Sequence, residues 1–215
     1  KSDSENEPLS LTVQIAKSDS SESGGTKIKT DIKTVKCNSF NLGLAMLNLE
    51  NVNQINLSHC TALVISEEVA REGLGNIINT IANNIEIRPT CNILVCQDKA
   101  KSFLETASKV EDISSKFYTS FIESIKITSY TTPCTISHFY STTHHDISSP
   151  LALYCFEKND NIETLGLAIF DRYTMIGRTS GIETICYNLL TDNFEESTIE
   201  VYNYQNPDIP LSINL

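Results

Sequence analysis

The sequence predicts an α+β protein made of two small mixed domains, each with a central sheet flanked by helices. Short apolar runs alternate with helical stripes in residues 60–107, in the order strand–helix–strand–helix. Two further strand-like runs, residues 151–157 and 164–170, are separated by the polar phrase KNDN, which is typical of a hairpin. With 215 residues, 40% of them hydrophobic and 20% charged, the chain can bury a core of this kind.

A polar stretch at residues 110–114 marks the expected boundary between the two domains. We predict an N-terminal domain over residues 1–110 and a second domain over residues 111–198. Residues 199–215 are expected to begin a truncated third domain or to form a tail.

The N-terminal segment predicts two strands and a helix. Residues 9–16 alternate between apolar and polar side chains, which indicates a half-buried strand. Residues 27–36 carry several lysines and suit an exposed or edge strand, because lysine discourages pairing with another sheet. Asn38 or Ser39 is placed to cap a short helix that begins at Phe40.

Residues 61–82 predict a buried strand that runs into a helix. Residues 61–65 (TALVI) are almost continuously apolar, as expected for an interior strand covered on both faces. Ser66 suits the N-cap, and Glu67 and Glu68 follow in the first turn, where the helix dipole favours negative charge. The helix has the apolar stripe Leu74, Ile77, Ile78 and Ile81, and Gly73 and Gly75 should weaken or bend it.

A second strand and helix follow the same plan. Residues 92–96 (NILVC) predict another interior strand, and Asp98 is placed to cap the helix over residues 100–107. Because a helix connects them, the strands at 61–65 and 92–96 should be parallel neighbours with a right-handed crossover.

The second half predicts helices and then strands. Its helix at residues 182–190 carries the apolar stripe Ile182, Ile185, Cys186 and Leu189, which indicates the packing face. The other expected elements are helices at 117–125 and 136–140 with a break at 128–133, the hairpin, a reversal at 171–174, and strands at 175–177 and 198–204.

Composition excludes several classes of protein. The net charge of −11 and the pI near 4.8 argue against a nucleic-acid partner, because phosphate binding needs clustered Lys and Arg. No apolar run approaches the roughly 18–20 residues that span a bilayer. The seven cysteines are odd in number, so at least one is free or pairs with another chain.

The best metal candidate is the group Cys134, His138, His144 and His145. Cys134 and His138 are spaced i, i+4, which places them on one face if both are helical. Pro133 and Thr135 indicate that the helix begins after Cys134, and neither CxxC nor HExxH occurs. We therefore interpret this group as a polar helix end with solvated histidines.

Other polar pairs also fail to converge. His59 and Cys60 would point to opposite faces of a strand, so they cannot act as base and nucleophile. Glu67 and Glu68 lie about 100° apart on a helix and do not form an acid–base pair. We expect no catalytic residue, no cofactor-binding residue, no cofactor and no metal ligand.

Two phrases and their order carry a resemblance to a known family. Residues 65–74 read ISEEVAREGL, preceded by NLSHCTALV and followed by the arginine-bearing segment IEIRPTCNILVCQDKAKSFL at 85–104. After Pro150 comes GLAIFDRYTMIG at residues 166–177. This order resembles the Ger(x)C proteins, the C-subunit lipoproteins of bacterial spore germinant receptors; Ser66 departs from the family's glycine at that position.

The resemblance implies a non-enzymatic subunit that takes part in nutrient-triggered spore germination through protein–protein contacts. Its implied partners are the integral-membrane A and B receptor subunits, and its implied place is the outer face of the spore inner membrane, through a lipid anchor absent from this sequence. Without that anchor we expect the chain to be soluble. The resemblance marks eight residues for a scaffold or partner-contact role: Glu67, Glu68, Gly73, Leu74, Arg88, Gly166, Phe170 and Gly177.

The residues of the sequence leave two other functions open. One is a ligand-sensing domain that binds the germinant directly. The other is a small thiol- or zinc-dependent enzyme that uses Cys134, His138 and His144. The sequence does not locate the partner surface.

Overall fold

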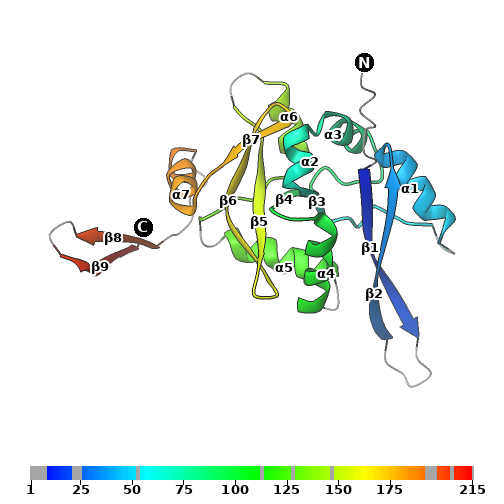
Figure 1. The fold of residues 1–215 in the computed structure, drawn as a ribbon, viewed down its shortest axis with the longest axis horizontal. Helices are drawn as coiled ribbons and strands as arrows, with labels where there is room; N and C mark the ends of the chain where they lie inside the picture. The colour runs from blue at the N-terminus through cyan, green and yellow to red at the C-terminus, as the bar shows by residue number, and fades with distance from the viewer. Residues whose placement is uncertain are drawn as a thin grey trace, which may run out of the picture.

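The chain folds into a five-stranded central sheet with helices on both faces, and a two-stranded hairpin lies towards each end (Figure 1). This arrangement confirms the predicted α+β class. The computed structural model describes residues 9–20, 26–51, 54–111, 114–126, 129–145, 148–191, 198–203 and 206–214. Its elements are β1 (Leu9–Ser20), β2 (Thr26–Cys37), α1 (Phe40–Leu49), β3 (Ala62–Ser66), α2 (Glu67–Glu72), α3 (Gly75–Ala82), β4 (Asn92–Cys96), α4 (Ala100–Val110), α5 (Ser114–Lys126), α6 (Ile136–Thr143), β5 (Leu151–Lys158), β6 (Asn161–Asp171), β7 (Thr174–Arg178), α7 (Gly181–Leu190), β8 (Thr198–Asn203) and β9 (Asn206–Asn214).

The central sheet has the strand order β3-β4-β5-β6-β7. The strands β3, β4 and β5 are parallel, whereas β5, β6 and β7 form an antiparallel meander. The predicted parallel pairing of the strands that are now β3 and β4 is confirmed, with Ala62 opposite Asn92. Leu94 pairs with Leu153, so segments on both sides of residue 110 share one sheet. The boundaries at 110/111 and 198/199 stay a prediction.

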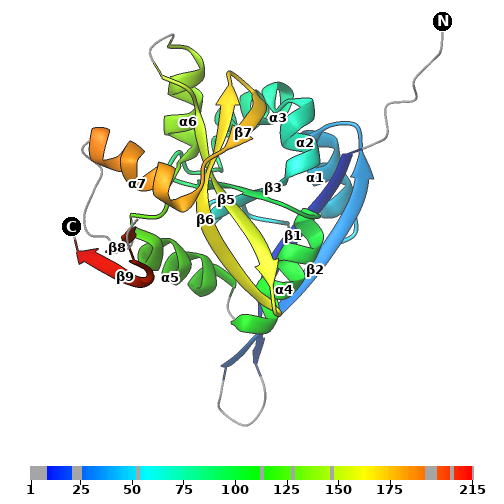
Figure 2. The ribbon, with the colours of Figure 1, turned by 60° about the vertical axis from the view of Figure 1, so that its left-hand side comes forward.

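Two helical layers cover the two faces of this sheet (Figure 2). Because side chains alternate along a strand, neighbouring residues of β4 enter different cores. Ile93 and Val95 pack with α1, α2, α3 and α6, and Leu94 and Cys96 pack with α4 and α5. All four of these side chains are at most 2% exposed, which confirms β4 as an interior strand.

The strand β3 lies at an edge of the sheet, which corrects the prediction that it is interior. It pairs with β4 on one side only, and Ala62, Leu63 and Val64 are half-buried. The apolar run misled the prediction because the β1–β2 hairpin stands beyond this edge and shelters it without pairing to it. The sequence therefore looks like that of a strand with neighbours on both sides.

The β1–β2 hairpin is anchored at several points. In β1, Gln14 donates from Nε2 to Ser108 Oγ of α4 at 2.6 Å and accepts from Tyr118 of α5 at 3.3 Å. Helix α1 follows β2 directly, and Ser39 caps it by accepting from the Leu42 N–H at 3.3 Å, as predicted. The two bonds of Gln14 hold the hairpin against the helices that cover the sheet.

The predicted helix over residues 67–82 is two helices, and Gly73 separates them. Gly73 has φ +118°, a conformation that favours glycine. Beyond it, the Leu74 N–H donates to the Tyr173 C=O at 2.8 Å instead of continuing α2. Ser66 occupies the N-cap of α2 without a side-chain bond, and Lys99, not Asp98, is the N-cap of α4.

Helix α7 presents a different face from the one predicted. Ile185 of the expected stripe is fully buried, but Ile182 is 60% exposed and Leu189 is 48% exposed, and Cys186 is exposed too. The buried face instead contains Thr184 and Asn188. Asn188 donates to the Ser129 C=O at 3.0 Å, and this polar contact sets the rotation of the helix.

Candidate functional site

The two segments that carry the family signature meet in space. Helix α2 lies against β7, and the Leu74 N–H donates to the C=O of Tyr173 in the β6–β7 turn at 2.8 Å. Gly75 faces the ring of that tyrosine, where an added Cβ would lie 3.7 Å from the ring. Gly73 and Leu74 therefore belong to a joint between the helix and the antiparallel part of the sheet.

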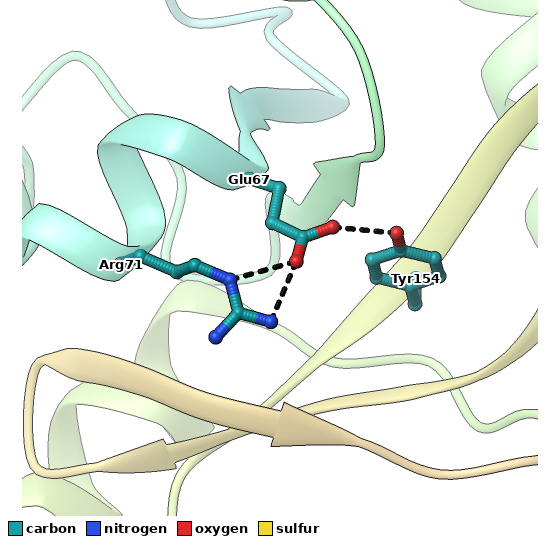
Figure 3. A network of polar contacts seen from close by, with 3 residues as sticks. All are labelled: Glu67, Arg71 and Tyr154. Atoms are coloured by element: carbon teal, nitrogen blue, oxygen red, sulfur yellow. Dashed lines mark hydrogen bonds and ion pairs between the residues drawn. The ribbon is translucent and has the colours of Figure 1, made fainter.

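A polar network lies beside this joint (Figure 3). The Glu67 carboxylate accepts from the Tyr154 hydroxyl at 2.6 Å and from Arg71 Nε at 2.7 Å. The Arg178 guanidinium lies over the Tyr154 ring, 4.8 Å from its centroid, in a cation–π contact. Glu67 thus connects α2 to β5 and, through the ring, to β7.

The electrostatics of this network keep Glu67 ionised. Burial by itself raises the pKa of Glu67, but the hydrogen bonds from Tyr154 and Arg71 and the charges of Arg71 and Arg178 outweigh it, so the pKa is below its ordinary value. Burial and the neighbouring carboxylate raise the pKa of Tyr154 to about 12. The tyrosine remains a donor and the glutamate an acceptor at neutral pH.

The adjacent Glu67 and Glu68 have different surroundings. Glu67 is committed to the internal network, whereas Glu68 is exposed and lines a groove. The roughly 100° step between neighbours on a helix accounts for this separation. Of the two, only Glu68 is free to meet a partner without first breaking internal bonds.

The glycines Gly166 and Gly177 and the ring of Phe170 belong to the sheet. Phe170 is fully buried and packs edge-on against Phe139, with centroids 4.9 Å apart. Gly166 has φ +98°, and an added Cβ would lie 2.1 Å from the Thr179 C=O oxygen. Gly177 has no atom within 4 Å of such a Cβ. Arg88 is exposed on the segment between α3 and β4, apart from the network.

A groove of about 1610 Å³ separates the β1–β2 hairpin from the free edge of β3. Its walls are the inner face of β1 and the outer edge of β3, and its sides carry charged residues from α2, α4 and β2. Its lining residues include Leu11 and Val13 of β1, Ala62 and Val64 of β3, and Cys60 and Glu68.

Within the described residues, the outer edge of β3 pairs with no other strand, and its backbone groups face this groove, where the Ala62 C=O accepts from the Cys60 thiol at 3.4 Å. The Thr61 C=O accepts from the Asn92 N–H at 3.0 Å, so residue 61 faces β4. Because alternate residues of a strand turn their polar backbone groups to opposite sides, Ala62 and Val64 face the groove. An edge of this kind is a template for an added strand.

The metal and thiol candidates do not come together. Cys134 is 1% exposed and precedes α6, and burial raises its pKa to about 12, which disfavours a reactive thiolate. His138, His144 and His145 are exposed on or just after α6. Among the described residues, no three His, Cys, Asp or Glu side chains gather as a metal site requires.

Sequence reasoning missed Arg71, Tyr154, Arg178 and the groove. The role of Arg71 could have been predicted, because it stands four residues after Glu67, which is the spacing of an ion pair on a helix. Tyr154 and Arg178 come from strands far along the chain, and no local sequence pattern indicates that they meet Glu67.

No helix within the described ranges is both long and apolar enough to cross a bilayer.

Comparisons with known proteins place the chain in a family. The family model described as "Spore germination protein N-terminal domain" matches residues 2–155. The chain is 23% identical to the "Spore germination protein GerQC" of Bacillus cereus over 179 residues, which is 82% of this chain and 49% of the relative. It therefore spans about half the length of that curated relative.

A solved structure shares the fold. The "Crystal Structure of the GerBC protein" aligns with a TM-score of 0.54 and 12% identity, and the alignment covers 97% of this chain and 64% of that one. The chain belongs to the family of spore germination proteins defined by this N-terminal domain.

Proposed function

We propose that this chain is part of a non-catalytic germinant receptor subunit that acts in nutrient-triggered spore germination through protein–protein contacts. Family membership and the similarity to a spore germination protein support the role. We further propose that its partners are the integral-membrane A and B subunits and that it works at the outer face of the spore inner membrane, held there by a lipid anchor.

The observation that carries the proposal is the groove beside β3. We propose that an extended segment of another receptor subunit pairs with the free edge of β3 and rests its apolar side chains against β1. Leu11 and Val13 offer apolar surface, and Ala62 and Val64 offer backbone hydrogen-bonding groups. At about 1610 Å³ the groove is larger than the roughly 300–1,000 Å³ of ordinary small-molecule sites.

A co-purification of the receptor tests this proposal. Val64→Pro removes the N–H that faces the groove and leaves the β3–β4 bonds in place, because those come from residues 61, 63 and 65. Glu68→Lys reverses a charge on the rim. We expect both variants to fold, by circular dichroism, and to recover at least tenfold less of the other subunits. Glu123→Lys, an exposed change on α5, is the matched control. Full recovery with both groove variants contradicts the proposal.

A second candidate function, direct binding of a germinant, has a specific observation in its favour. A hollow of about 440 Å³ lies where β3 and β4 end, and Glu68, Asp98 and Lys99 line it. The carboxyl ends of parallel strands are common ligand sites, and these charges suit a zwitterion such as an amino acid. Calorimetry with amino acids tests it: heat that disappears in Lys99→Ala supports binding, and no heat with any amino acid removes this candidate.

A further inference from the structure

We propose that Cys60 and Cys91 form a reversible dithiol–disulfide site that reacts with small-molecule disulfides entering through the groove. Their sulfur atoms lie 3.8 Å apart, and both cysteines are free thiols. A disulfide needs an S–S distance of ~2.05 Å, so the two side chains must approach by roughly 1.8 Å. Because 31 positions separate the two cysteines in the sequence, no local pattern indicates that they form a pair.

Strand pairing keeps the two thiols together. Cys60 stands two residues before β3, and Cys91 stands directly before β4, its parallel neighbour. The backbone of Cys91 is held on both sides, by its N–H to the Arg88 C=O at 2.9 Å and by its C=O from the Ile136 N–H at 2.8 Å. The Cys60 N–H donates to the Leu57 C=O at 2.9 Å. These bonds hold both backbones in place on either side of the sulfur pair.

The two thiols differ in access and in acidity. Both cysteines line the groove, but Cys60 is half-buried, whereas Cys91 is only 1% exposed. Cys91 donates to Cys60, and this hydrogen bond lowers the pKa of Cys60 in spite of its burial. The same bond and burial raise the pKa of Cys91. Cys60 is thus the thiol suited to attack, and Cys91, whose sulfur lies 3.8 Å away, is the thiol placed to resolve the mixed disulfide.

The reaction is a balanced thiol–disulfide exchange. The Cys60 thiolate attacks one sulfur of a disulfide RSSR, forms a mixed disulfide with it and releases RS⁻. The Cys91 thiol then gives up its proton to solvent base and attacks Cys60 Sγ, and the second RS⁻ leaves. Both released thiolates take up protons, so two protein thiols are oxidised and RSSR is reduced to two RSH.

The other cysteines make a useful contrast. Cys96 and Cys155 are register partners on β4 and β5, but they are 2% and 0% exposed inside the α4–α5 core, where an oxidant does not reach. Cys186 is exposed on α7 and is therefore open to a mixed disulfide, so it is replaced by serine in the test. Within the described residues, only the Cys60–Cys91 pair has its two thiols in hydrogen-bonding contact and one of them open to a groove.

Oxidation would change the mechanics of the groove. The bond closes a loop that contains β3, α2 and α3, and it ties the start of β3 to the start of β4. The disulfide then holds the start of β3 against β4, which increases the free energy of unfolding of the chain. The exchange needs only the free chain, whose groove is open at Cys60; a receptor subunit seated in the groove would block access to that thiol.

The test uses the reduced chain carrying Cys186→Ser, incubated with oxidised glutathione and then alkylated. Before alkylation, we expect the intact mass to lie two hydrogen atoms below that of the fully reduced chain; after alkylation, we expect peptide mapping to find Cys60 joined to Cys91. The melting temperature should rise by about 5–10 °C, and dithiothreitol should reverse both changes.

Two variants separate the roles of the thiols. With Cys91→Ser added, Cys60 should keep one glutathionyl group, because nothing resolves the mixed disulfide. With Cys60→Ser added, we expect no glutathionyl group and no disulfide. The proposal is overturned if the folded parent chain does not react, if Cys60 retains glutathione while Cys91 is present, or if the bond found joins Cys96 to Cys155.

Discussion

Glu67 on α2 and Tyr154 on β5 are joined by a 2.6 Å hydrogen bond, although 87 positions separate them in the chain. This bond, together with the ion pair of Glu67 to Arg71, fixes the signature helix on the central sheet. Strand β3 ends at Ser66, directly before α2 begins at Glu67, so the network also fixes one end of the groove.

Removal of the Tyr154 hydroxyl should destabilise the fold. Tyr154→Phe leaves Glu67 with Arg71 as its remaining partner and removes a bond to a charged acceptor, so we expect the free energy of unfolding to fall by about 1–2 kcal/mol. Urea denaturation measures the change. Glu68→Gln is the control, and its effect should stay within about 0.5 kcal/mol, because Glu68 is exposed. Equal effects of the two changes would contradict a special role for the network.

The same network predicts a pH dependence. The pKa of Glu67 is lowered in the folded chain, so its contribution to stability is present above the ordinary value of about 4.3 and is lost as the pH falls through the folded value. The unfolding free energies of the parent chain and Glu67→Gln should therefore differ at pH 7 and converge below about pH 4. A difference that stays constant down to pH 3 would contradict this assignment.

The same substitution at Gly166 and at Gly177, two glycines of the family resemblance, should have effects of very different size. Gly166→Ala introduces a Cβ 2.1 Å from a backbone oxygen at φ +98°, and we expect a loss of about 3 kcal/mol or more in unfolding free energy. Gly177→Ala meets no atom within 4 Å, so its effect should lie within about 1 kcal/mol. Thermal and urea unfolding of the two variants compare them directly.

The observed rotation of α7 gives a paired test. Ile185→Ser removes a fully buried side chain and should cost about 2–4 kcal/mol. Ile182→Ser changes a side chain that is 60% exposed and should cost less than about 0.5 kcal/mol. If the two costs were similar, the stripe predicted from the sequence, and not the observed face, would describe the packing.

Local chemistry made much of the fold predictable. The β5–β6 hairpin follows from KNDN, whose Asn159 and Asp160 both adopt positive φ, the conformation of a tight hairpin turn. Ser39 and the bend at Gly73 are likewise encoded within a few residues of where they act. These features need no knowledge of the rest of the chain.

Features that depend on distant partners were not predictable. The apolar run of β3 does not reveal that the neighbour beyond it is an unpaired hairpin, so the edge and the groove were missed. Helix α7 has a regular apolar stripe, but Asn188 finds the Ser129 C=O and turns a different face inward. In each case a tertiary contact overrides the local pattern.

Hydrogen exchange at the backbone of β3 tests the central claim most directly. The amides of Ala62 and Val64 should exchange rapidly in the isolated chain and become at least tenfold slower when the chain is assembled with the other receptor subunits, because a partner strand then accepts from them. Unchanged exchange of both amides in the assembled receptor would contradict a partner strand in the groove.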